Sequence, residues 1–189
     1  MDNILVVSAA EKATVLSDAL TKSGQFGRVA CAGNGGEARR TMMADPFEIV
    51  LINTPLPDET GYDLALHLSR NTEAGVVVLV RGEHADEVAA KLEDGGILVV
   101  PKPVSRPLLF QSLKMAAAAR RRLLRLRSEN VRLQQKIEEI RLVDRAKCVL
   151  IQTLSLTEQQ AHRYIEKQAM DSRLPRREIA HQILKTYEE

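Results

Sequence analysis

The chain has 189 residues, of which 44% are apolar, and its formal net charge is +2. This length suits one large domain or two small ones, and the apolar content is ample for a core. No run of about 18 apolar residues is present, which excludes a membrane-spanning helix. The N-terminus enters a strand-like run without a basic segment, so we expect no signal peptide and a cytoplasmic protein.

The charge is divided unevenly along the chain. Residues 1–109 carry 10 basic and 15 acidic side chains, a net charge of −5, whereas residues 110–189 carry 17 basic and 10 acidic ones, a net charge of +7. This division indicates two domains with different partners, and the basic C-terminal part favours a polyanion. The alternative is that the basic helices are merely solvated.

The first 115 residues alternate between strand-like and helix-like segments. The predicted strands are Ile4–Val7, Arg28–Cys31, Ile49–Asn53, Val76–Val80 and Ile97–Val100. The predicted helices are Glu11–Ser23, Gly36–Asp45, Tyr62–Asn71, His84–Asp94 and Pro107–Ala119. Because such apolar strands are buried on both faces, these repeats predict an α/β, flavodoxin-like domain with a five-stranded parallel sheet over residues 1–115.

Two loop sequences follow the predicted strands at one edge of this sheet. The third strand ends at Asn53 and leads into LPDETGYD (residues 56–63), and the fifth leads into Pro101-Lys102-Pro103. With the β-α order, these residues resemble the receiver domain of two-component response regulators. The resemblance implies a phosphoryl-accepting aspartate after the third strand and an acidic pair that holds Mg²⁺ after the first. It also implies a hydroxyl residue and a lysine that contact the phosphoryl oxygens.

Most of these chemical groups are replaced in this sequence. Asn53 stands at the acceptor position, Ser8 and Ala9 replace the acidic pair, and the hydroxyl position falls at Val80, so that only Lys102 remains. A neutral amide is no nucleophile for an acyl phosphate, and Mg²⁺ requires hard, anionic oxygen ligands. We therefore predict a pseudo-receiver that is not phosphorylated and needs no metal or cofactor. Lys102 is expected in a salt bridge or a loop contact.

A region without glycine or proline extends from Ala116 to Cys148. Its apolar residues alternate at steps of three and four, which is the pattern of a coiled coil. The predicted seam consists of Leu123, Leu126, Asn130, Leu133, Ile137 and Ile140. Because a buried Asn at the first seam position favours two parallel strands, residues 116–144 predict a parallel homodimer.

Four basic residues beside the seam argue against this pairing. In a parallel coil, Arg122 would face Arg127 of the other chain, and Lys136 would face Arg141. Both pairs are exposed, so the expected cost is small. The alternative to dimerisation is a helix that packs on its own domain.

Residues 145–189 are expected to form a small domain of three helices. The long helix continues through Arg145–Thr153, and Thr157 with Gln160 forms a capping-box start for a helix over Glu158–Asp171. Pro175 suits the first turn of a third helix, which ends at about Tyr187.

Four short sequences in these helices carry a second resemblance. They are RAKCVL at 145–150, TEQQAH at 157–162, QAM at 168–170 and EIA at 178–180. This part resembles the output domain of ANTAR-type transcription antiterminators, although that family usually has glycine where Cys148 stands. The resemblance implies a dimer that binds paired hairpins in nascent leader mRNA and prevents a terminator from forming. Without a phosphate switch, control would come from a partner such as a regulatory sensor protein.

RNA binding requires cations for phosphates and side chains that reach unpaired bases. The candidates are Lys147, Arg163, Tyr164, Lys167, Gln168, Arg173, Arg176 and Arg177. Tyr164 could stack on a base and Gln168 could bond to a base edge, one residue round from Arg163 and Lys167. Alternatively, Tyr164 packs in the small core.

Two other classes of binding protein remain open. The last two predicted helices are joined by a short turn, and Arg176 and Arg177 open the third helix, as in a DNA-binding helix-turn-helix. A dimer that titrates a protein partner is the other alternative. An enzyme is disfavoured by the lack of a catalytic set or a phosphate loop. Cys31 and Cys148 are expected to be reduced, buried thiols.

Overall fold

The computed structural model describes residues 1–187. The chain divides into two compact units, Met1–Arg125 and Leu126–Glu189. Each unit has its own apolar core, so the two are described separately.

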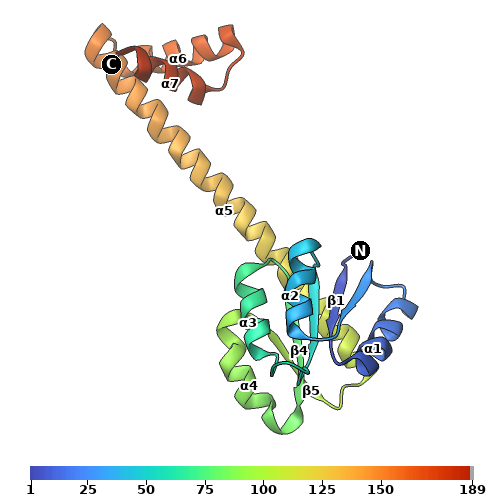
Figure 1. The fold of residues 1–189 in the computed structure, drawn as a ribbon. Helices are drawn as coiled ribbons and strands as arrows, with labels where there is room; N and C mark the ends of the chain where they lie inside the picture. Colours follow the sequence, from blue (N-terminus) through green and yellow to red (C-terminus); the bar gives the residue numbers. More distant parts are fainter. Residues whose placement is uncertain (188–189) are drawn as a thin grey trace. The chain divides into compact units, whose positions relative to one another are not determined.

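The first unit is built on five parallel strands in the order β2-β1-β3-β4-β5 (Figure 1). Their bounds are β1 (Ile4–Val7), β2 (Val29–Ala32), β3 (Ile49–Asn53), β4 (Gly75–Arg81) and β5 (Leu98–Lys102). Strands β1 and β3 are buried along their whole length, as continuous apolar runs between helical layers require. This confirms the predicted flavodoxin-like fold, with each strand displaced by no more than two residues.

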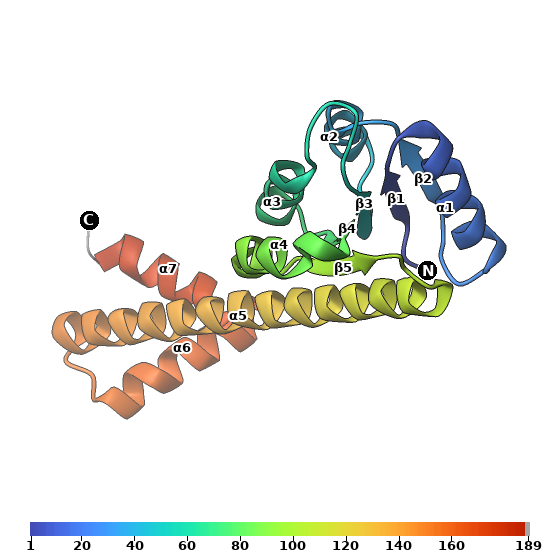
Figure 2. The same cartoon turned by 90° about the horizontal axis from the view of Figure 1, so that it is seen from below.

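Helices cover both faces of this sheet. They are α1 (Ala10–Lys22), α2 (Gly35–Ala44), α3 (Tyr62–Asn71), α4 (Ala85–Leu92) and the first part of α5 (Arg106–Leu154). One core cluster joins the sheet to α2, α3 and α4, and the other joins it to α1 and α5. Figure 2 shows the same helices from a second direction. The predicted helix His84–Asp94 is shorter than expected, because a 3₁₀ turn lies at each end of α4.

The strand order brings the carboxyl ends of β1 and β3 together. Each residue of β1 pairs with one of β3, from Ile4 with Ile49 to Val7 with Ile52. The chain reverses its direction of sheet growth at β1, which lies between β2 and β3. Ligands of open α/β sheets bind at this edge, so the fold places Ser8 and Asn53 where a receiver has its chemistry.

The middle of α5 exposes the predicted seam. Its apolar members are each between 50% and 54% exposed: Leu123, Leu126, Leu133, Ile137 and Ile140. Asn130, the polar member, is exposed as well. Within residues 1–187, these side chains therefore form a half-exposed apolar row along α5.

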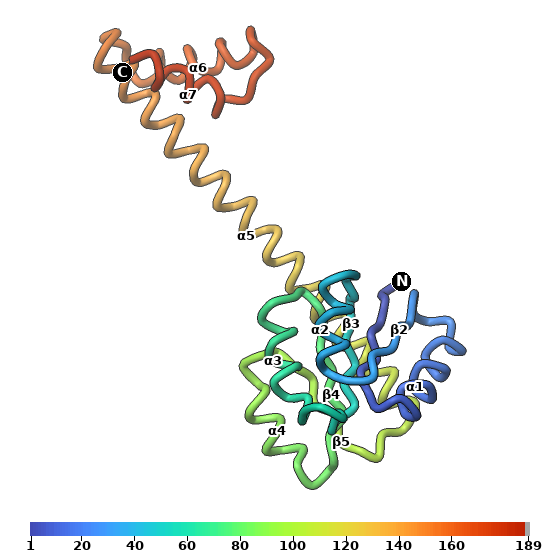
Figure 3. The backbone as a smooth tube through the Cα atoms, in the orientation of Figure 1, coloured from blue at the N-terminus to red at the C-terminus, as the bar shows by residue number. Residues whose placement is uncertain are grey.

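The second unit consists of the end of α5 with α6 (Glu158–Ser172) and α7 (Arg176–Tyr187), as the tube in Figure 3 traces. Its core joins Ala146 and Leu150 of α5 to Ile165 of α6 and to Ile179 and Ile183 of α7. The predicted capping box is present, because the Thr157 hydroxyl accepts from the Gln160 amide and the Gln160 side chain accepts from the Thr157 amide. The backbone amides of Thr157 and Gln160 are both thereby satisfied at this end of α6.

Both cysteines are exposed, so the expectation of buried thiols was wrong. Cys31 lies on β2, which is an edge strand and has a neighbour on one side only. Cys148 lies on α5 between the buried residues Ala146 and Val149, but points away from them. Apolar neighbours in the sequence therefore did not imply burial at either position.

Among residues 1–187, no helix combines the length and the apolar character that crossing a membrane requires.

Candidate functional site

The carboxyl edge of the receiver-like sheet is closed by a chain of hydrogen bonds. The Asn53 side-chain amide donates to the Ser8 hydroxyl at 3.0 Å, and the Lys102 ammonium donates to the Asn53 amide oxygen at 3.2 Å. The same ammonium donates to the Thr54 carbonyl. Ser8 is 0% and Asn53 7% exposed, so both are buried. The structure thus brings together three of the predicted pocket residues.

Lys102 has no carboxylate partner among residues 1–187; its partners are neutral oxygens. The salt bridge considered for this lysine is therefore absent, and its contact is with the loop after β3. Burial of the ammonium lowers the pKa of Lys102, and the nearby cations Lys12 and Arg81 lower it further. The amide of Asn53 holds this cation by a dipole where a carboxylate would hold it by charge.

This edge does not fit Mg²⁺ or phosphoryl chemistry. Among residues 1–187, no group of three or more His, Cys, Asp or Glu side chains could hold a metal. The Ser8–Ala9 pair and Asn53 offer no anionic oxygen, which Mg²⁺ requires. Val80, at the expected hydroxyl position, is a fully buried aliphatic residue. The nearby Thr54 hydroxyl is turned away, because it donates to the Leu79 carbonyl at 2.8 Å.

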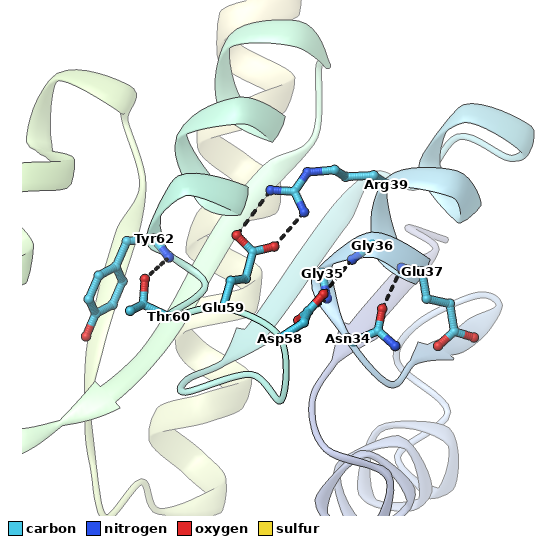
Figure 4. A network of polar contacts seen from close by, with 9 residues as sticks. All are labelled: Asn34, Gly35, Gly36, Glu37, Arg39, Asp58, Glu59, Thr60 and Tyr62. Carbon is cyan, nitrogen blue, oxygen red and sulfur yellow. Dashed lines mark hydrogen bonds and ion pairs between the residues drawn. The ribbon is translucent and has the colours of Figure 1, made fainter.

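Asp58, the acid nearest to this edge in sequence, has a structural role. Its two carboxylate oxygens accept from the Gly35 amide at 2.9 Å and from the Gly36 amide at 3.0 Å (Figure 4). These amides open α2, where donors lack partners within the helix. The bond from Gly35, followed by that from Gly36, lowers the pKa of Asp58. The carboxylate is therefore ionised and fixed on α2.

Glu59 attaches the same loop to α2 a second time. It receives both arms of the Arg39 guanidinium, at 2.5 and 3.1 Å (Figure 4). The contact depends on Gly35, because a Cβ at that position would lie 1.7 Å from a Glu59 carboxylate oxygen. The loop then turns at Gly61, whose φ of 92° favours glycine. This network was not among the features predicted from the sequence, although the glycine pair of GNGG and the acid pair of PDET both mark it.

The C-terminal unit presents most of the predicted RNA-binding residues to solvent. Arg163, Tyr164 and Lys167 lie along one side of α6 and are exposed, and Gln168 is half-buried beside them. Tyr164 is 37% exposed, while its neighbours Ala161 and Ile165 fill the core. Tyr164 therefore lies at the rim of this core and is partly open to solvent.

The predicted cations divide into two sets by their partners. Lys147 is held by Asp144 at 2.7 Å and by Glu158 at 3.4 Å, and Arg176 is held by Glu166 at 3.1 Å. The ion pair with Asp144 is the main reason why the pKa of Lys147 is raised. Among residues 1–187, no carboxylate pairs with the remaining predicted cations, Arg163, Lys167, Arg173 and Arg177. These four cations have their full charge available for a ligand.

Comparison with known proteins agrees with both units. The response regulator receiver domain matches residues 4–114, and the ANTAR domain matches residues 131–184. Transcriptional regulatory protein PdtaR of Mycobacterium tuberculosis is 28% identical over 155 residues, which cover 82% of this chain and 76% of that protein.

Solved structures show the receiver fold. A response regulator receiver domain protein from Clostridium thermocellum is 19% identical, with a TM-score of 0.58, and covers 65% of this chain and 99% of that one. The receiver domain of a histidine kinase from Syntrophus aciditrophicus is 21% identical, with a TM-score of 0.55, and covers 63% and 92%.

The sheet order and the closed carboxyl edge define the first unit as a receiver-type domain whose phosphorylation groups are replaced. The chain belongs to the response regulator receiver family, and with its ANTAR domain it is a response regulator of the ANTAR class.

The Asp58 carboxylate gives a prediction for stability. Its lowered pKa means that its stabilisation is fully present above the unfolded value of 3.8 and is lost as the pH falls through the lower, folded value. We expect Asp58→Asn to lower the urea midpoint of the receiver unit at pH 7, and the difference from wild type to shrink below pH 3.8. Circular dichroism at a series of pH values measures this.

The control is Asp18→Asn on α1, which is exposed and without a bond to a helix terminus. A midpoint for Asp58→Asn equal to that of the control at pH 7 would contradict the capping role.

Proposed function

We propose that this response regulator is an RNA-binding transcription antitermination factor. Two copies pair through a parallel coiled coil of α5, and their ANTAR domains bind paired hairpins in nascent leader mRNA. The receiver domain takes part without being phosphorylated. The observation that carries the proposal is the ANTAR match over residues 131–184. In this domain, α6 exposes cations that have no carboxylate partner within residues 1–187.

The exposed side of α6 supplies both kinds of group that hairpin recognition needs. Arg163 and Lys167 can neutralise phosphates, and Tyr164 offers an aromatic face to an unpaired base. Gln168 adds an amide beside them. Arg173 follows at the end of α6, in the left-handed conformation that ends this helix. Lys147 and Arg176 contribute to the fold of the domain through their carboxylate partners rather than to RNA directly.

The exposed seam of α5 supports dimerisation. Five aliphatic side chains in one row, each half exposed, are a surface that a second copy of the same helix would cover. We assign residues 1–115 to the receiver-like domain, 116–144 to the dimerisation helix and 145–189 to the ANTAR domain. All three parts share α5, which runs without interruption from Arg106 to Leu154.

Control of such a regulator has to act without an acyl phosphate. The edge at Asn53 offers no nucleophile, and its hydrogen bonds are satisfied internally. We propose that a partner, such as a sensor protein, masks or releases the dimer by binding the receiver-like domain.

The first prediction concerns RNA selectivity. Two-hairpin RNAs selected from a pool with random loops are expected to bind more tightly than scrambled RNA of equal length or duplex DNA, and to keep this preference near physiological salt. Arg163→Ala or Tyr164→Ala should remove the preference, because each deletes one proposed contact. The loss of one stacked base costs about 1–3 kcal/mol. Titration with fluorescent RNA measures both effects.

Lys91→Ala on α4 serves as the control for a lost cation, since its partner is Glu87 and it lies in the receiver unit. Equal binding to all three nucleic acids that disappears with salt would reduce this function to a basic surface. A preference for the duplex would favour the helix-turn-helix reading of α6 and α7 instead.

The second prediction concerns the dimer. Leu133 is 50% exposed in the single chain, so pairing would bury roughly half of a leucine, about 1 kcal/mol per copy. Leu133→Ala should therefore weaken the dimer by about 2 kcal/mol, roughly thirtyfold in dissociation constant. Val131→Ala is the matched control, because Val131 is 52% exposed but lies off the seam. Sedimentation equilibrium measures the dimer dissociation constant of all three proteins. A monomeric wild type, or equal effects of both variants, would mean that the coil is not the interface.

The third prediction concerns the receiver edge. Acetyl phosphate with Mg²⁺ should leave no acid-labile label on the wild type, and Asn53→Asp alone should gain none, because Ser8 and Ala9 supply no metal ligand. Intact-mass spectrometry before and after acid treatment detects the label, with a conventional receiver as the assay control. Acid-labile phosphate on the wild type would exclude the phosphate-independent mechanism.

A further inference from the structure

A groove in the second unit is lined by cations that lie outside α6. It encloses about 530 Å³ between α5 and the start of α7. Its lining residues are Arg132, Leu133, Gln135, Lys136 and Glu139 of α5, with Arg177 of α7. Three of these side chains are cations, and Glu139 is the only carboxylate among the six. The groove is therefore positively charged.

The charge of this groove is not neutralised by ion pairs. Within residues 1–187, Arg132, Lys136 and Arg177 form none with a carboxylate. A neighbouring groove of about 310 Å³ shares Lys136 and Glu139 but differs in this respect. In that second groove, Lys147 and Arg176 already form ion pairs with Asp144 and Glu166. The first groove is therefore the one that is open to an anion from outside the chain.

The position of Lys136 connects this groove with the coil. Lys136 directly precedes the seam residue Ile137, and Leu133, another seam residue, lines the groove. In a parallel, in-register coil, Lys136 would face Arg141 of the second copy. Two such like-charge pairs per dimer weaken an empty coil, but they would surround a bound phosphate with a further cation.

We propose that the groove between α5 and α7 binds the phosphate backbone of RNA and that Arg141 of the second copy completes it. This inference rests on the proposed function and adds a contact away from the bases. A bound phosphate removes the repulsion across the coil, so backbone binding and dimerisation strengthen each other. The basic residues beside the seam, which oppose pairing in the free protein, thus acquire a role in the complex.

Reversing one charge separates this proposal from a purely structural role of Lys136. Lys136→Glu would attract Arg141 of the second copy while repelling phosphate. We expect a dimer that is roughly two- to tenfold tighter, as exposed charge pairs of this kind allow. We expect weaker binding to two-hairpin and scrambled RNA alike, because backbone contacts carry no sequence information. Arg132→Gln should weaken binding to both RNAs by roughly two- to fivefold.

The slope of log affinity against log salt concentration is the second readout. It should fall by about 0.7–0.9 for each phosphate contact that a variant loses. RNA titrations are made at protein concentrations well above the dimer dissociation constant, so that pairing does not limit binding. Lys22→Glu is the control, because Lys22 is an exposed lysine at the end of α1 and the change in net charge is the same.

The outcomes distinguish this inference from the proposed function. A wild type that prefers two-hairpin RNA, with Lys136→Glu and Arg132→Gln equal to the control in affinity and slope, overturns the groove alone. A wild type that does not prefer two-hairpin RNA overturns the antitermination function. The groove is then tested by whether the variants have a smaller salt slope than the control on scrambled RNA. A Lys136→Glu dimer no tighter than wild type overturns the contribution of Arg141.

Discussion

The organisation of this protein depends on one helix that has to suit three environments. The first part of α5 completes a sheet core through Leu109 and Leu113, and its last part carries Ala146 and Leu150 of the second core. Between them lies a row of aliphatic side chains that the chain leaves half exposed. Because an uninterrupted helix cannot fold back on itself, α5 alone cannot cover this row, and in the proposed dimer a second copy of α5 covers it.

The receiver-like unit shows how a switch site can be retained as a scaffold. In place of a charged pocket, it has an amide that donates to Ser8 and accepts from Lys102. Each of these polar groups has a hydrogen-bond partner within the chain. The loop after β3 is fixed to α2 through Asp58 and Glu59. The groups of phosphate chemistry are replaced at this edge, whereas the receiver fold around them is kept.

The fold could be predicted from the sequence because its patterns are local. Apolar runs such as Ile49–Asn53 specify buried strands, and Thr157 with Gln160 specifies a helix start within four residues. The placement of Asn53 at a sheet edge followed from the same patterns. Each of these features is determined by neighbours in sequence.

Contacts between distant segments could not be predicted in this way. The sequence presents Lys147 as one of several free cations, but the packing of α5 against α6 brings it within 3.4 Å of Glu158. Asp58 caps a helix that lies 22 residues before it in the chain. The groove beside Lys136 exists only because α7 returns to α5. In all three cases, tertiary packing decides which charges are used internally and which are left for a ligand.

The small core of the second unit has a thermodynamic consequence. Within residues 1–187, nine buried side chains from three helices form it, and a unit of this size buries a modest share of its surface. Under the proposed pairing, association through α5 and binding of RNA both favour the folded form of this unit. By mass action, both therefore add to its stability. The melting temperature of this unit would then rise with protein concentration, whereas that of the receiver-like unit, with its own two-sided core, would stay constant. Cellular abundance would then set how much of the output domain is folded.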